Sequence, residues 1–175
     1  PIDAWGVGTN LVTGGRTSSF TGVYKLAAKK NGGDYEPTMK VSDNPEKMTN
    51  PGVKQVHRFV DEHGAPLADL IAFADEEFEP GNRYTFFHPT TDYRKFTLKH
   101  FAKAMPMLQP YMRDGEIVGH LPDLAHIQRH TREGLQGLDE TFTRILNPHI
   151  YKVSLSERLK TMKFDMVRSY ASREL

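Results

Sequence analysis

Apolar and polar residues alternate in short runs through the first 120 positions, a pattern typical of half-buried β-strands. The strands predicted from this pattern are residues 23–28, 38–41, 54–61, 66–74, 83–88 and 93–98. Asn31-Gly32-Gly33-Asp34 is a turn signal, and Asp114-Gly115 predicts one more hairpin over 111–118. Residues 10–22 and 42–53 are rich in small, polar and proline residues and are predicted to be exposed loops.

Helical spacing replaces this alternation near Pro122, which is a favourable residue for the first turn of a helix. Apolar residues from Leu124 to Leu138 recur at roughly helical intervals, so a helix is predicted there. A short second helix is expected over 139–146.

The last helix is predicted from a capping signal and an apolar stripe. Ser154 and Glu157 have the spacing of a capping box, which marks a helix start. The stripe that follows consists of Leu155, Leu159, Met162, Met166 and Tyr170. Together with the strands, these helices predict an α+β fold.

Composition narrows the class of protein. A chain of 175 residues can bury one sound core. Lys and Arg total 23 against 22 Asp and Glu, which argues against a general nucleic-acid or anionic-membrane binder. The absence of cysteine excludes a disulfide framework and is compatible with the cytoplasm, where we expect the protein. No apolar run is long enough to span a membrane, and no signal peptide pattern begins the chain.

The clearest candidate for chemistry is Gly6-Val7-Gly8-Thr9, which follows a short strand signal. Two glycines around one residue let backbone N–H groups converge on an anion without an intervening Cβ. The Thr9 hydroxyl can add a donor. This pattern predicts a phosphate-binding loop, although any tight turn can use the same glycines. The third glycine of a Rossmann fingerprint and the Gly-Lys-Ser/Thr of a Walker loop are absent.

A second candidate is the proline-containing loop 42–54, because prolines can stiffen a loop that carries cationic side chains. Its basic residues Lys47 and Lys54 could contact phosphate or diphosphate groups, with Arg58 as a weaker third contact. The alternative is a solvated connection with ordinary surface lysines.

Two further patterns are better explained without a ligand. His126 and His130 stand four apart on a predicted helix, near His120, but no zincin-type Glu follows His126. A polar helix surface is the preferred interpretation, and no metal site is predicted. The basic side of the last helix is interpreted as a solvated face; its residues are Arg158, Lys160, Lys163 and Arg168.

Four segments in order resemble the C-terminal portion of the nicotinate phosphoribosyltransferase family. They are IDAWGVGTNL at 2–11, GVYKL at 22–26, the Lys- and Pro-containing loop that begins KVSDNPEK at 40, and VSLSERL at 153–159. The chain departs from the family at 16–21, where RTSSFT replaces a Gln-Pro-x-Leu type of run.

The resemblance implies an irregular α/β barrel with an accessory β-rich domain. It implies that nicotinate is joined to 5-phosphoribosyl-1-diphosphate, with ATP hydrolysis and Mg²⁺ on the diphosphate, giving nicotinate mononucleotide. It also implies a homodimer with active sites near the subunit interface. The family phosphorylates a histidine whose motif has no match in this chain, so no catalytic residue is assigned here; that histidine and the nicotinate-binding residues are expected in a preceding barrel portion.

Three regions are expected on this interpretation. Residues 1–22 would hold the last barrel strand and the phosphate loop, 23–120 an antiparallel β-rich accessory domain, and 121–175 a helical tail. Two alternatives remain open: a nicotinamide phosphoribosyltransferase, and a non-catalytic β-rich binding module whose glycine loop is only a turn.

Overall fold

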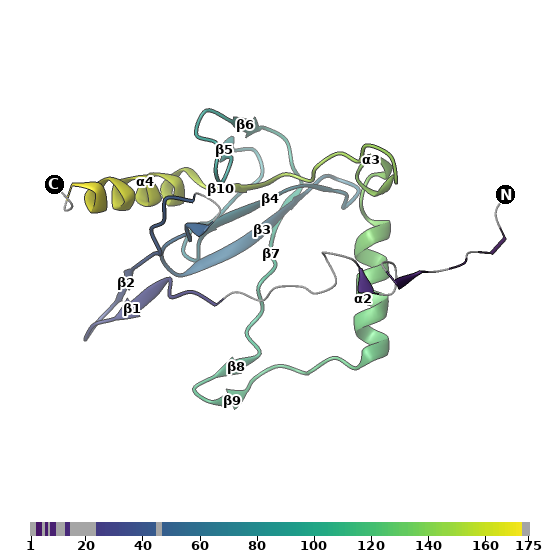
Figure 1. The fold of residues 1–175 in the computed structure, drawn as a ribbon, viewed down its shortest axis with the longest axis horizontal. Coiled ribbons are helices and arrows are strands. Elements are labelled where there is room, and N and C mark those ends of the chain that lie inside the picture. The colour runs from purple at the N-terminus through teal and green to yellow at the C-terminus, as the bar shows by residue number, and fades with distance from the viewer. Residues whose placement is uncertain are drawn as a thin grey trace.

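The computed structural model describes residues 3, 4, 6, 8, 9, 13, 14, 24–44 and 47–172. In this part of the chain a six-stranded sheet forms the centre, with two separate hairpins and three helices around it (Figure 1). The mixed α+β class expected from the sequence is confirmed. The predicted last barrel strand falls mostly on residues outside the described ones and stays a prediction.

The central sheet is mixed, with the strand order β6-β5-β10-β4-β3-β7. Its strands are β3 (Lys54–Val60), β4 (Pro66–Phe73), β5 (Tyr84–Phe87), β6 (Lys95–Leu98), β7 (Lys103–Pro106) and β10 (Val153–Leu155). β10 runs parallel to β4, while the other neighbouring pairs are antiparallel. The expected antiparallel domain is therefore corrected to a mixed sheet, because a strand from the C-terminal segment enters between β4 and β5. A boundary at residue 120 would separate β10 from this sheet.

Alternation of side chains on β4 divides the core into two clusters, one on each face of the sheet. Ala68 and Leu70 belong to an aromatic cluster with Phe59, Phe86 and Phe101, in which the Phe59 and Phe101 ring centroids lie 4.8 Å apart. Phe73 belongs to the other cluster; its companions there are Leu155 and Leu159, with Ile71 and Met162 packed against them. Both faces of the sheet are thus covered.

The strands of the two hairpins are short and directly flank the predicted turns. β1 (Ala28–Lys30) and β2 (Tyr35–Pro37) pair with Lys30 opposite Tyr35, so the strands predicted at 23–28 and 38–41 are displaced towards the turn. The predicted hairpin at Asp114-Gly115 is confirmed by β8 (Met112–Arg113) and β9 (Glu116–Ile117). Asp114 and Gly115 both have positive φ, 52° and 84°, as a type I′ turn requires.

Each helix begins at a side-chain cap. Asp123 caps α2 (Leu124–Gln136), and Asp139 caps the short α3 (Glu140–Thr143). Ser156, not Ser154, caps α4 (Glu157–Ala171), and its Oγ accepts a hydrogen bond from the Leu159 N–H. The predicted capping box is wrong because Ser154 is buried in β10.

Candidate functional site

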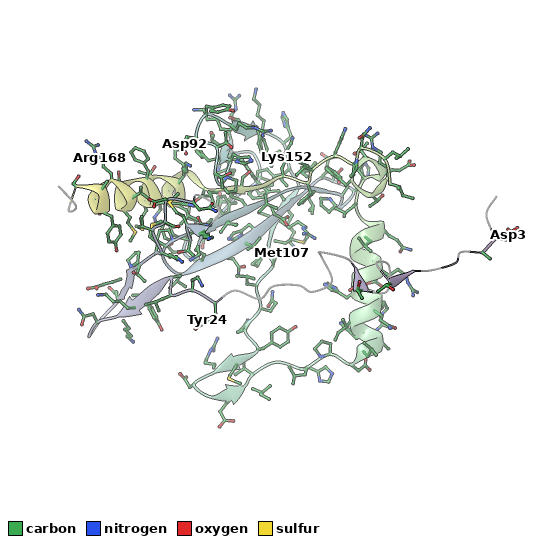
Figure 2. All side chains as sticks on the ribbon, in the orientation of Figure 1. Asp3, Tyr24, Asp92, Met107, Lys152 and Arg168 are labelled. Carbon is green, nitrogen blue, oxygen red and sulfur yellow. The ribbon has the colours of Figure 1, made fainter. Side chains whose placement is uncertain are left out.

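The glycine loop lies at the N-terminal end of the described chain. Gly6, Gly8 and Thr9 are exposed, and a Cβ placed on either glycine would meet no atom within 4 Å. Thr9 and Thr13 are helical, and the Thr13 hydroxyl donates to the Thr9 carbonyl oxygen at 2.9 Å. Thr13 was expected in a loop, and its helical conformation corrects the prediction at that residue. Figure 2 places Asp3 far from Arg168 near the end of α4.

The second half of loop 42–54 packs against the folded core. Pro51 and Gly52 are buried, and the Gly52 N–H donates to the Ala27 carbonyl oxygen at 2.7 Å. The Thr49 hydroxyl accepts from the Lys40 N–H at 2.8 Å. The loop is therefore anchored at its C-terminal end, in contrast to the fully solvated connection that was its alternative interpretation.

A buried lysine of α4 also holds this loop. The Lys163 ammonium donates to the Asn50 side-chain oxygen at 2.9 Å, and Lys163 is only 7% exposed. Burial lowers its pKa, nearby Lys160 lowers the pKa further, and Asp92 acts in the opposite direction. The sequence did not indicate this contact, since the residues are far apart in the chain and Lys163 was assigned to a solvated face.

The rest of that basic face is also partnered rather than simply solvated. Arg158 forms an ion pair with Asp75 at 2.8 Å and lies 4.9 Å from the centre of the Phe73 ring. Lys160 pairs with Asp92. Of the predicted basic face, Arg158, Lys160 and Lys163 therefore contribute to holding α4 on the sheet.

The three candidate phosphate contacts differ in their surroundings. Lys47 is exposed, and its ammonium forms no ion pair within the described ranges. Lys54 is half-buried at the start of β3, and its ammonium donates to the Gly52 carbonyl oxygen. Burial lowers the pKa of Lys54. Lys47 thus has the greater freedom to contact a ligand.

Arg58 is committed to a partner inside the sheet. Its guanidinium makes two hydrogen bonds to the Asp69 carboxylate, at 2.9 and 2.8 Å, from β3 to β4. The hydroxyl of Tyr151 also donates to Asp69, at 3.0 Å. The bonds to Asp69 raise the pKa of Arg58, and burial together with the Asp69 charge raises the pKa of Tyr151. Arg58 is less available to a phosphate than Lys47, because Asp69 offsets its charge and occupies two of its donors.

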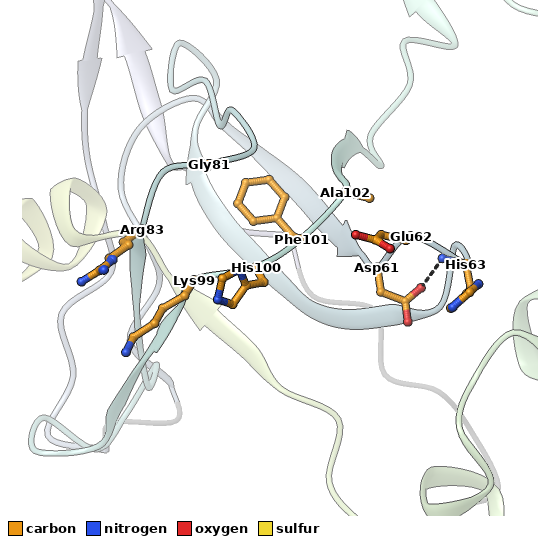
Figure 3. Close-up of a pocket in the computed structure, with 9 residues that line it drawn as sticks. All are labelled: Asp61, Glu62, His63, Gly81, Arg83, Lys99, His100, Phe101 and Ala102. Atoms are coloured by element: carbon orange, nitrogen blue, oxygen red, sulfur yellow. Dashed lines mark hydrogen bonds between the residues drawn. The ribbon is translucent and has the colours of Figure 1, made fainter.

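The structure also contains a cavity of about 490 Å³ that the sequence did not indicate (Figure 3). Arg83, Lys99 and His100 stand on one side of it, while Asp61 and His63 stand on the other. The Asp61 carboxylate accepts from the backbone N–H groups of residues 63 and 65, at 2.9 and 2.8 Å, so it closes its own turn. No sequence motif could reveal this cavity, because separate turns and connections build it.

The histidines of α2 are exposed, and the Asp123 carboxylate near them caps the helix at the His126 N–H. No group of three or more His, Cys, Asp or Glu side chains in the described residues could hold a metal ion. Among those same residues, no helix combines the length and the apolar character needed to cross a bilayer.

Comparison with known proteins identifies the family. Residues 53–163 match the model of the nicotinate phosphoribosyltransferase C-terminal domain. The nicotinate phosphoribosyltransferase of Bacillus subtilis is 35% identical over 174 residues, covering 98% of this chain and 35% of the relative. The Caenorhabditis elegans enzyme of the same name is 36% identical over 160 residues, covering 90% of this chain and 28% of the relative.

A solved structure supports the same family. The crystal structure of human nicotinic acid phosphoribosyltransferase superposes with a TM-score of 0.58 and 27% identity, covering 67% of this chain and 23% of that chain. This chain therefore spans about a third of the length of the curated relatives it matches. On these matches, the chain belongs to the nicotinate phosphoribosyltransferase family, in which it corresponds to the C-terminal domain.

Proposed function

We propose that this chain is the C-terminal part of an enzyme that joins nicotinate to 5-phosphoribosyl-1-diphosphate and yields nicotinate mononucleotide and pyrophosphate. The observation that carries this proposal is the family match over residues 53–163. Relatives that bear the enzyme's name align with nearly the whole chain, which supports the same conclusion.

The proposed contribution of the glycine loop is to position the ribose phosphate. Displacement of pyrophosphate from ribose builds positive charge on the sugar, so positioning and charge stabilisation dominate catalysis. The exposed, unobstructed backbone at Gly6 and Gly8 leaves room for a phosphate oxygen near the N–H groups of Gly8 and Thr9. No catalytic residue is assigned to this chain.

Among the basic candidates, Lys47 is proposed as a diphosphate contact because its side chain is exposed. Lys54 would act as a second, shorter-range contact, since its ammonium already donates to Gly52 and retains two further hydrogens. Arg58 would support both indirectly by holding β3 to β4 through Asp69.

ATP and Mg²⁺ are proposed for the complete enzyme. Mg²⁺ would be held mainly by diphosphate oxygens and water, because it keeps several waters and is usually bound through substrate phosphates. When bound, it would neutralise the diphosphate charge. The proposed setting is a cytoplasmic homodimer in which a preceding barrel portion completes each active site.

The test of the reaction is a product assay on the full-length protein with nicotinate or nicotinamide, each with and without ATP. We expect nicotinate mononucleotide to form and ATP to increase its yield. Preference for nicotinamide would support the alternative phosphoribosyltransferase, while no product from either base would favour a non-catalytic module.

The phosphate loop is tested by Gly8→Val in the full-length enzyme, with Gly33→Val as the matched control. A Cβ at either glycine meets no atom within 4 Å, so neither change should disturb the described fold. We expect only Gly8→Val to weaken nicotinate mononucleotide binding, by about 10-fold or more, because its side chain would occupy the phosphate position. Equal affinities of both variants would refute the assignment.

A further inference from the structure

The segment 107–150, which we call the arm, leaves the sheet after β7 and returns to it at β10. It contains the β8–β9 hairpin, α2 and α3, and none of its residues is buried. Figure 1 shows α2 and the hairpin standing apart from the sheet. The arm therefore has no core of its own within the part of the chain that the structure describes.

Apolar side chains are nevertheless abundant on the arm. More than half of the exposed large apolar residues of the described chain belong to it. They are Met107, Leu108, Tyr111, Met112, Ile117, Val118, Leu121, Leu124, Ile127, Leu135, Ile145, Leu146 and Ile150. Extensive exposed apolar surface of this kind marks an interaction site in a folded protein.

The helix α2 is the longest regular element of this surface. Leu124, Ile127 and Leu135 lie on one face, with exposures of 70%, 48% and 57%. Arg129 and Glu133 fall on the opposite face by the same helical spacing. An isolated helix of 13 residues is marginal in water, so α2 needs a surface on which to bury its apolar face.

We propose that the arm docks through the apolar face of α2 onto the portion of the full-length polypeptide that precedes this chain. This inference rests on the proposal that the chain is one domain of a longer enzyme. The amount of chain outside the structure supports it: the matched relatives are about three times as long as this chain.

The position of the N-terminal end favours the same occupant. Figure 2 shows Asp3 on the side of the sheet where α2 lies, opposite to Arg168 near the end of α4. A polypeptide that precedes Asp3 would therefore approach from the side where α2 is unpartnered. The protein's own sheet does not offer an alternative, because the aromatic cluster and α4 cover its two faces.

The first test is hydrogen exchange of the wild-type full-length protein, which avoids any variant that fails to fold. We expect the backbone amides of 124–136 to exchange about 100-fold or more slowly than in an unstructured chain, since docking must open before they exchange. Exchange at the unstructured rate would overturn the proposal.

The second test identifies the occupant. The photoreactive residue p-benzoylphenylalanine replaces Ile127 in the full-length protein, with the same replacement of Glu133 on the opposite face as control. We expect cross-links from position 127 to peptides that precede residue 1 of this chain, with the mass of one polypeptide, and few from position 133. A cross-linked species of twice that mass would assign the face to a second copy and overturn the proposal, as would equal yields from both positions.

Neither readout depends on enzyme activity, so the two proposals fail separately. An intramolecular cross-link in a protein that makes no nicotinate mononucleotide would support the docking and refute the reaction. An active enzyme with no cross-link from position 127 would support the reaction and refute the docking.

Discussion

Gly52 stands where a side chain is excluded for two separate reasons. Its φ is +81°, and a Cβ there would lie 2.4 Å from Cε1 of the Phe73 ring. We expect Gly52→Ala to lower the free energy of unfolding by about 3 kcal/mol, from backbone strain and overpacking together. Urea denaturation measures this loss.

The control for this prediction is Gly64→Ala. Gly64 has nearly the same φ, +82°, but a Cβ there meets no atom within 4 Å. The free energy of unfolding of Gly64→Ala should fall only by the contribution of backbone strain, about 1 kcal/mol. Equal losses for the two variants would show that Phe73 moves aside without cost.

His57 predicts an acid sensitivity. Its Nε2 is buried without a hydrogen-bond partner in the described residues, and its ring lies 4.9 Å from that of Phe78. Burial lowers its pKa from 6.5, although Glu76 opposes the shift. Below pH 6.5 the unfolded state then binds more protons than the folded state, so stability falls as the pH falls from 6.5 towards the lowered pKa.

Replacing the imidazole should remove this contribution. We expect the free energy of unfolding of His57→Leu to decline less steeply than that of the wild type between pH 7 and 5, as measured by urea denaturation at each pH. Parallel pH profiles would mean that the folded protein admits water to His57 and does not resist its protonation.

At the scale of elements, the start of α4 is fixed by its N-cap residue, Ser156. The Ser156 hydroxyl accepts from the Leu159 N–H and donates to Glu76 at 2.7 Å, and the same Glu76 oxygen accepts from the Phe73 N–H. Ser156→Ala removes the cap and leaves the half-buried Glu76 carboxylate short of one donor. We expect a loss of about 2 kcal/mol in urea denaturation.

Ser169→Ala is the matched control on the same helix. Its hydroxyl is exposed and donates only to the Met166 carbonyl oxygen, at 2.8 Å. This variant should change stability by less than about 0.5 kcal/mol. If the two variants lost the same free energy of unfolding, the hydrogen bond from Ser156 to Glu76 would contribute no more to stability than that of an exposed serine.

The sequence predicted those elements whose signals are local. Alternation located β3 and β4 within about one residue, and Asp114-Gly115 located a hairpin, because pleat and turn chemistry act over neighbouring residues. It missed β10, since Val153–Leu155 is too short to show a period and becomes a strand only between β4 and β5. It predicted α2 but not the exposure of its apolar face.

For the candidate site, too, the sequence predicted local features but not contacts between distant residues. Glycine spacing and proline content singled out residues 6–9 and 42–54 from local sequence alone. The partners that distinguish Arg58 and Lys163 from free cations are Asp69 on the next strand and Asn50, more than a hundred residues earlier. Such pairings depend on the folded topology, which residue spacing does not encode.

At the scale of the whole molecule, the chain corresponds to about a third of a longer enzyme in its relatives. The features proposed for it are an exposed phosphate loop, an exposed lysine and an apolar arm. None of them is proposed to bind the base or to carry a phosphoryl group. We therefore expect residues 1–175 alone to fold but to form no nicotinate mononucleotide.

The measurement that checks this prediction is product formation by the purified 175-residue chain, with the full-length protein assayed beside it under the same conditions. Circular dichroism of the chain controls for unfolding, because an unfolded chain would be inactive for a trivial reason. A folded but inactive chain fits a domain that contributes phosphate contacts to a site built elsewhere. Turnover by the chain alone near the full-length rate would mean that these residues contain the base site and the catalytic group, and would refute that division of roles.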